Sequence, residues 1–161
     1  MLTRYSILAA SLLAGLAVAA VATGSGHNVQ VVRSLKNTKL HETVLVNMKG
    51  LTLYSLSAER KGKFICTNKS CLSFWHPLVV PAGDTPTGAA NLATIKRPDG
   101  REQVTYKGGP LYTFTGDHAK GQANGQGFKD VGVWKAAALS GSAPPPPTTT
   151  SAPTTTGIYG Y

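Results

Sequence analysis

Two copies of one short segment constrain the fold of this chain more than any other feature. The first copy runs over residues 49–59 and the second over residues 107–117. Each copy opens on a Lys-Gly turn, continues into an apolar strand with a tyrosine, and ends on an acid. Agreement at several ordered places indicates an internal repeat. The matching positions are Val46 with Val104, Lys49-Gly50 with Lys107-Gly108, Leu53-Tyr54 with Leu111-Tyr112, Glu59 with Asp117, Gly62 with Gly121, and Trp75 with Trp134.

The residues around the copies favour β-structure throughout. Short runs rich in β-formers alternate with Gly and Pro turns, and no amphipathic helix of ten or more residues is evident. The Pro98-Asp99-Gly100 segment is a strong turn signal, and the strand that follows it alternates polar and apolar residues. The segments expected as strands are 43–48, 51–56, 63–65, 91–97 and 102–106.

Two copies are too few for an open solenoid. We therefore expect an all-β domain over residues 43–138, in which two pseudo-symmetric β-meander repeats pack into one compact unit. Repeat one spans 43–80 and repeat two spans 102–137.

The strand of each copy departs from simple alternation. Leu53 and Tyr54 are adjacent and both large, and Leu111 and Tyr112 repeat the arrangement. Strict alternation would place apolar groups on both faces of the sheet. Each strand is therefore either buried on both sides or bulged at this point.

The two ends of the chain differ in composition from the middle. Residues 1–22 combine a short basic start with an uncharged Ala- and Leu-rich run and small residues before a polar stretch, which predicts a signal peptide. An uncleaved membrane anchor is the alternative. A linker is expected over 23–42, and a disordered Pro/Thr-rich tail over 139–161. We expect the mature protein to be secreted or associated with the cell envelope.

The charge balance limits the classes of partner that the protein is expected to bind. Lys and Arg outnumber Asp and Glu by 16 to 7. Outside a cell this balance favours anionic cell-wall polymers or lipid headgroups, with a merely soluble basic surface as the alternative. The lysines are scattered rather than clustered in a dense run, which argues against nucleic acid.

The second copy contains a recognisable motif. This motif is Tyr112-x-Phe114-x-x-Asp117, and the first copy adds a Gly-x-x-Leu-Tyr opening at residues 50–54, the pair Cys66 and Cys71, and Trp-His-Pro-Leu at residues 75–78. Together they resemble the bacterial secreted repeat family of predicted lipoproteins of unknown function. The resemblance covers about residues 43–137 and implies a tandem β-repeat of unknown activity. The first copy departs from the motif, with Leu56 for the aromatic and Glu59 for the aspartate. The lipid-anchoring cysteine of many relatives is absent, and His76 stands where the family has a proline.

Cys66 and Cys71 are the only cysteines. In an exported chain an even count favours a disulfide that closes a short loop. A metal site with His76 is the alternative, although zinc would need a fourth ligand that the sequence does not identify.

The tyrosine and acid of each copy have two interpretations. In the structural one, the ring fills the edge of the core while the hydroxyl or the carboxylate satisfies turn amides. In the functional one, Tyr112, Asp117 and His118, with His76, bind a metal or haem, because phenolate, carboxylate and imidazole are iron ligands. The repetition of the motif favours the structural interpretation.

The leading hypothesis is an exported, non-enzymatic β-repeat module of the cell envelope, with a binding or structural role and no cofactor. The first alternative is an extracellular metal- or haem-binding protein. The second is a hydrolase, for which Glu59 and Asp117 would have to converge on one cleft. No serine or cysteine nucleophile stands in a recognisable elbow.

Overall fold

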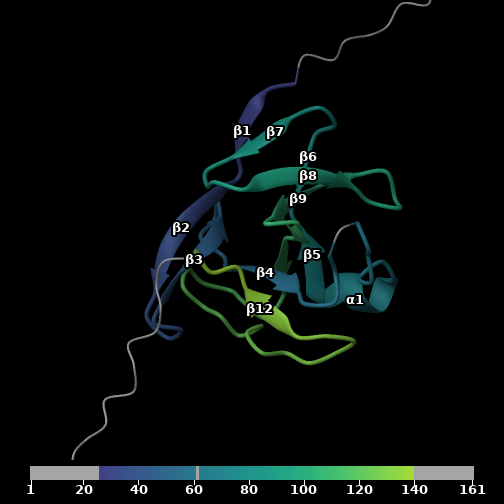
Figure 1. Cartoon of the computed structure of the whole chain (residues 1–161). Helices are drawn as coiled ribbons and strands as arrows, with labels where there is room; N and C mark the ends of the chain where they lie inside the picture. The colour runs from purple at the N-terminus through teal and green to yellow at the C-terminus, as the bar shows by residue number, and fades with distance from the viewer. Residues whose placement is uncertain (1–25, 61, 140–161) are drawn as a thin grey trace, which may run out of the picture.

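The structure is a computed structural model that describes residues 26–60 and 62–139. It consists mostly of short strands, which confirms the all-β prediction (Figure 1). The elements are β1 (Asn28–Gln30), β2 (Val32–Asn37), β3 (Glu42–Asn47), β4 (Leu53–Leu56), α1 (Lys69–Phe74), β5 (Trp75–Pro77), β6 (Val79–Val80), β7 (Thr85–Thr87), β8 (Leu92–Lys96), β9 (Glu102–Tyr106), β10 (Gly109–Pro110), β11 (Tyr112–Phe114) and β12 (Trp134–Ala136).

One four-stranded sheet joins the two copies, in the order β12-β4-β11-β5. Its central strands β4 and β11 are antiparallel, and Tyr54 lies directly opposite Tyr112. The outer strands are the ends of the two repeats, so that Trp134 lies opposite Leu56 and Trp75 opposite Phe114. Corresponding residues of the two copies therefore meet across this sheet.

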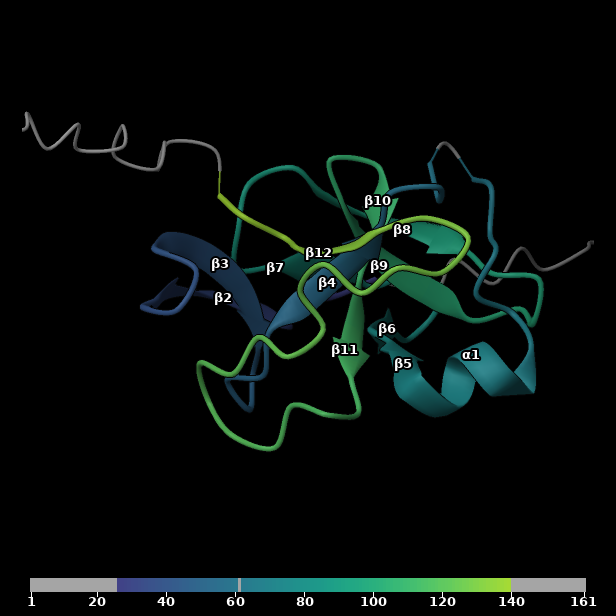
Figure 2. The same ribbon diagram turned by 90° about the horizontal axis from the view of Figure 1, so that it is seen from below.

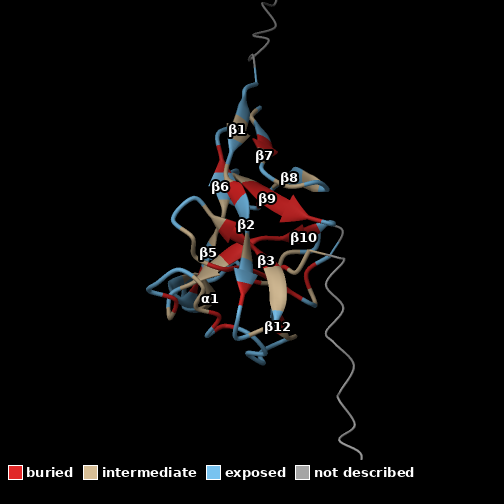
Figure 3. Cartoon of the chain, turned by 90° about the vertical axis from the view of Figure 1, so that its left-hand side faces the viewer, coloured by how far each residue is buried: buried red, intermediate tan, exposed pale blue. Residues whose placement is uncertain are grey.

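A second sheet is centred on β9, which pairs with β8, β6 and β10. The turn at Pro98-Asp99-Gly100 connects β8 to β9 as predicted, and a tight Lys107-Gly108 turn connects β9 to β10. The polar and apolar residues of β9 alternate as the sequence shows, but residues 103–106 are all buried. Val104 and Tyr106 pack in the hydrophobic core, whereas Gln103 is buried by its hydrogen bonds to Arg97 and Leu111. Figure 3 shows β9 as a buried strand in the middle of the domain.

The predicted linker is also partly wrong. Its residues 28–37 form β1 and β2, which pair with β7 and β3 respectively. The β2 strand has little pattern of its own, because only Val32 and Asn37 are buried at its ends. Its conformation comes from a six-residue antiparallel register with β3 rather than from local propensity.

The adjacent large residues Leu53-Tyr54 and Leu111-Tyr112 lie between two hydrophobic clusters. This arrangement shows whether their strands are bulged or buried on both sides. Leu53 and Leu111 belong to one buried cluster, whereas Tyr54 and Tyr112 belong to the other. All four side chains are completely buried. The strands β4 and β11 are therefore buried on both sides.

The predicted disulfide joins Cys66 to Cys71, with 5.4 Å between their Cα atoms. The same segment contains the short helix α1, which was not predicted, and the strand expected at 63–65 does not form. Asn68 caps this helix by accepting the Cys71 backbone N–H at 2.9 Å. A six-residue helix is too short to show a 3.6-residue period. Figure 2 shows α1 beside β5, at the opposite end of the domain from β2 and β3.

Backbone hydrogen bonds repeat in the two copies with one shift from the sequence alignment. The Leu45 N–H donates to Ala137 O and the Val104 N–H donates to Leu78 O, so Leu45 rather than Val46 corresponds to Val104. The first turn is one residue longer than the second, since Val46 bridges Thr52 whereas Thr105 pairs with Pro110. A full two-fold superposition of the repeats stays a prediction.

The predicted signal peptide (1–22) and the tail from residue 140 lie outside the described residues. Leu139, expected to begin the tail, donates its backbone N–H to Thr43 O. Within the part of the chain that the structure describes, no helix has the length and apolar character to cross a membrane.

Candidate functional site

The tyrosine of each copy donates a hydrogen bond to the acid of the other copy. The Tyr54 hydroxyl donates to Asp117 Oδ2 at 2.6 Å, and the Tyr112 hydroxyl donates to Glu59 Oε2 at 2.8 Å. Because the two tyrosines face each other across β4 and β11, neither motif is complete within its own repeat. The two copies are thus joined by two buried, charge-assisted hydrogen bonds.

The remaining oxygen of each acid accepts backbone amides from the loop that follows it. Glu59 Oε1 accepts the N–H groups of Ile65 and Cys66, both at 2.7 Å. Asp117 Oδ1 accepts the N–H of Asn124 at 2.9 Å. This arrangement matches the structural interpretation of the motif, in which a carboxylate satisfies turn amides.

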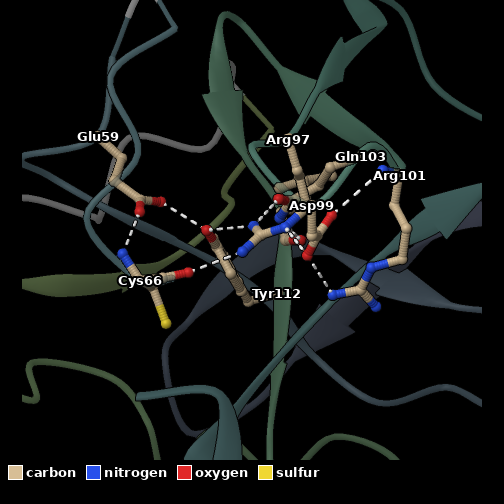
Figure 4. A network of polar contacts seen from close by, with 8 residues as sticks. Glu59, Cys66, Arg97, Asp99, Arg101, Gln103 and Tyr112 are labelled. Atoms are coloured by element: carbon tan, nitrogen blue, oxygen red, sulfur yellow. Dashed lines mark hydrogen bonds and ion pairs between the residues drawn. The ribbon is translucent and has the colours of Figure 1, made fainter. Parts of the chain in front are cut away.

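Arg97 is a central residue of this network, and sequence reasoning missed it. Its side chain is almost fully buried, and its Nη1 donates to the Tyr112 hydroxyl at 3.2 Å (Figure 4). Its Nη2 donates to Cys66 O at 2.8 Å, which ties it to the loop closed by the disulfide. The Tyr112 hydroxyl therefore lies between a buried carboxylate and a buried guanidinium.

Gln103 and Asp99 accept further hydrogen bonds from the Arg97 guanidinium group. Gln103 Oε1 accepts a hydrogen bond from Arg97 Nη1, while Gln103 Nε2 donates to Leu111 O at 2.7 Å. Asp99 Oδ2 accepts from Arg97 Nε at 3.3 Å and from Arg101 Nη2 at 2.8 Å. The Arg101 contact holds the pKa of the exposed Asp99 carboxyl well below its ordinary value.

Both motif tyrosines resist ionisation. Burial raises the pKa of Tyr54 far above its ordinary value, and the hydrogen bond to Asp117 adds to this effect. Burial also raises the pKa of Tyr112, and the negative charge of Glu59 contributes next. Both groups are neutral donors at physiological pH, which suits a structural hydrogen bond and opposes a role as phenolate ligands.

We expect the domain to lose stability in alkaline solution. A tyrosine with a raised pKa keeps its proton in the folded state but loses it in the unfolded state above pH ~10. The free energy of unfolding should therefore fall by about 1.4 kcal/mol per pH unit for each of the two tyrosines. Urea unfolding curves between pH 8 and 11.5 measure this slope.

The single variants Tyr54→Phe and Tyr112→Phe serve as controls for that slope. Each should show a shallower pH dependence than the wild type, because one tyrosine no longer contributes. A slope that is identical in all three proteins would contradict the assignment.

An aromatic cluster lies under the same sheet. The rings of Trp75 and Trp134 stack with centroids 3.8 Å apart and an interplanar angle of 6°. Tyr54 contacts Trp75 edge-on at 5.4 Å, and Tyr112 contacts Trp134 in the same way at 5.1 Å. The Trp134 indole N–H is buried and has no hydrogen-bond partner among the described residues.

A cavity lies beside this cluster, between α1 and the loop before β12. It has a volume of about 410 Å³ and is lined by Trp75, the exposed Phe74 and Phe128, and Asn68, Cys71 and Asp130 among others. Neither Phe74 nor Phe128 was predicted to be a surface residue. Phe74 lies at the end of a helix shorter than two turns, and Phe128 lies in a loop. The alternating pattern of strands gives no information about exposure at such positions.

The residues predicted as a metal or haem site do not form one hydrogen-bonded cluster. Tyr112 is bonded to Glu59 and Arg97, whereas Asp117 is bonded to Tyr54 and Asn124. The side chains of His118 and His76 are exposed. Over residues 26–60 and 62–139, no three His, Cys, Asp or Glu side chains are grouped so as to hold a metal ion. Metal or haem binding stays a hypothesis that elemental analysis and an absorbance spectrum of the purified protein can test.

The carboxylates proposed for a hydrolase are likewise engaged. Glu59 and Asp117 are both buried, and each uses both of its oxygens in hydrogen bonds to a tyrosine and to backbone amides. A general acid or base has to reach a substrate proton at hydrogen-bond distance. The described contacts leave neither carboxylate oriented toward a cleft.

Residues 93–138 match the model of a family described as a secreted repeat of unknown function. The matched segment contains the second copy, and it confirms the resemblance to this family. The extension of the resemblance to the first copy stays a prediction. The description as secreted supports the predicted extracellular location. No curated protein and no solved structure matches the chain.

Proposed function

We propose that this protein is an exported, non-enzymatic β-repeat module that binds anionic polymers of the cell envelope. The secreted description of the matched family supports export. The observation that carries the proposal is the division of charge between the inside and the outside of the domain.

The acids and the bases are distributed very differently. All seven acidic residues lie in the described part of the chain, and Glu59 and Asp117 are buried in the tyrosine network. Asp99 forms ion pairs with Arg97 and Arg101. Among the described Lys and Arg residues, by contrast, Arg97 alone is buried. The exterior is therefore more cationic than the composition suggests.

A surface of this kind concentrates polyanions around it. Interactions between exposed charges are screened within about 10 Å at 0.1 M salt, so binding of this origin is strongly salt-dependent. The polar groups of both motifs, by contrast, are already satisfied within the fold. A module that presents charge on a rigid β scaffold is suited to adhesion rather than to catalysis.

Retention on isolated cell-wall polymers tests the proposal. We expect the mature protein to bind at low ionic strength and to elute progressively between 50 and 300 mM salt, values chosen to span the range in which screening becomes effective. An acetylated sample, in which the lysine charges are removed, is the control and should not be retained. Absence of retention of the unmodified protein at moderate salt would count against envelope binding.

A further inference from the structure

A small cavity beside the β12-β4-β11-β5 sheet has three basic residues and no acidic residue in its described lining. It has a volume of about 210 Å³ and lies between the β4–β12 edge and the turn that joins β9 to β10. Its charged lining residues are Arg60, Lys107 and Lys135. Ser55, three successive alanines at residues 136–138, and the ring of Tyr106 complete the lining. The short side chains of the serine and the alanines leave the space open.

Each cation is held there by a defined part of the fold. Lys135 lies directly opposite Ser55 in the β12–β4 pair. Lys107 occupies the tight turn after β9, where its φ of 49° turns the chain toward β10, and its ammonium lies 5.1 Å from the centre of the Tyr106 ring. Arg60 directly follows Glu59, whose carboxylate is fixed by its buried hydrogen bonds.

Glycine at position 109 lets the Arg60 side chain approach the β10 backbone. A Cβ atom at Gly109 would lie 3.2 Å from Arg60 Nη1 and 3.4 Å from the Ser55 Cβ. The guanidinium therefore rests over the second hairpin, close to the serine side chain that lines the same cavity.

Arg60 and Lys135 have no acidic partner among the described residues. None of the described residues that line the cavity is acidic, and neither Arg60 nor Lys135 has an acidic side chain within 4 Å among them. Three cations around one hollow repel each other and create a positive potential there. Arginine forks and lysine ammonium groups are the side chains that bind phosphate oxygens.

The first repeat shows a related arrangement, which is an independent observation. Lys120 lies three residues after Asp117, and a Cβ atom added at Gly50 would lie 2.6 Å from its Cγ. Lys120 therefore covers the turn before β4, as Arg60 covers the turn between β9 and β10. A cavity of about 160 Å³ lies there, with Arg33 and Lys120 as its charged lining residues and no acid among the described ones. Both repeats thus place a cation on the hairpin of the other repeat.

We infer that the cavity of Arg60, Lys107 and Lys135 binds phosphate groups of an anionic envelope polymer, an inference that rests on the proposed function. Two cavities that each contain cationic side chains and no described acid suit a chain with repeated negative charges better than a single small anion. A lipid surface is disfavoured, because none of the exposed large apolar side chains lines this cavity and the one aromatic ring in its lining, that of Tyr106, is buried. The exposed large apolar residues are Met48, Phe74, Val79, Phe128 and Val131.

Binding of poly(glycerol phosphate) and of inorganic phosphate to the mature protein tests the inference. The variant R60Q/K135Q removes two of the three cations. The matched control K39Q/K96Q removes the same charge at two exposed lysines that do not line the cavity. We expect the first variant to weaken polymer binding at least tenfold, and the control less than twofold. Amide signals of Ser55 and Gly109 should shift on titration with phosphate in the wild type.

The outcomes separate the inference from the proposed function. Equal weakening in both double variants would overturn the cavity as the site while leaving general envelope binding intact. Phosphate-induced shifts at Ser55 and Gly109 without retention on wall polymers would support the site and contradict the proposed function. Tighter binding to vesicles of phosphatidylglycerol than to the polymer, lost in R60Q/K135Q, would overturn the choice of a polymer.

Discussion

Replacing Arg97 by glutamine is expected to lower the free energy of unfolding by about 3–5 kcal/mol, the range seen when one partner of a buried charge pair is removed. Arg97 and Glu59 do not touch each other, but both contact the Tyr112 hydroxyl, so each compensates the other through it. The substitution also removes donors from Cys66 O and Gln103 Oε1, and buried acceptors without donors are costly. Urea unfolding measures the loss.

The matched control is Arg101→Gln, which removes the same charge four residues away. Arg101 is exposed and pairs with an exposed Asp99, so its loss should leave the unfolding midpoint almost unchanged. Equal losses in the two variants would show that net charge, rather than the buried network, is responsible. The double variant Arg97→Gln/Glu59→Gln should be more stable than the sum of the single losses predicts, because no unpaired charge remains.

Local patterns were sufficient for much of this fold. Turn signals at Pro98-Asp99-Gly100 and Lys107-Gly108 place the hairpins, and β9 was predicted with its observed ends. The disulfide followed from two cysteines in an exported chain. These features depend on neighbouring residues, or on composition, and a sequence reports both directly.

The centre of the site depends on contacts between distant segments, which is why it was not predicted. Arg97 follows a strand and precedes a turn, where an arginine is ordinarily exposed. Its burial requires Cys66, Gln103 and Tyr112 to meet in space. Each motif tyrosine bonds to the acid of the other motif because β4 and β11 pair in an antiparallel register. The sequence does not show this pairing, since a carboxylate five residues after a tyrosine could equally bond to that same tyrosine.

The β2 strand shows the same limit in the backbone. Only two of the six residues of β2 are buried, so the segment has no alternating pattern that would predict a strand. Its pairing with β3 was not predicted either. The sequence predicted consecutive strands at 43–48 and 51–56, which correspond to β3 and β4. In the structure the only bridge between them is Val46 with Thr52, and β3 pairs along its whole length with β2.

The stacked tryptophans join the two repeats as directly as the tyrosines do. Trp75 closes the first repeat and Trp134 closes the second, and both are buried. Trp75 also contacts Phe114 at 4.5 Å and Tyr54 at 5.4 Å, which belong to different copies. Removing one tryptophan therefore disturbs the packing of both repeats at once.

We expect Trp75→Ala to cost about 3–5 kcal/mol, as is usual when a buried aromatic side chain is truncated and leaves a cavity. Because marginal stability is typically 5–15 kcal/mol, such a loss should be evident as a large fall in the unfolding midpoint. Phe74→Ala is the matched control, since Phe74 lies next in sequence and is 53% exposed. The loss of stability in Phe74→Ala should be small.

The two tryptophan variants also test whether the repeats fold as one unit. If they do, Trp75→Ala and Trp134→Ala will each unfold in a single transition. Far-UV circular dichroism and the fluorescence of the remaining tryptophan will then report the same transition. The double variant will lose less than the sum of the two, because the second substitution removes a ring whose stacking partner has already gone. Two separate transitions, or strict additivity, would instead mean that the repeats are stable independently and that the stack contributes little to their union.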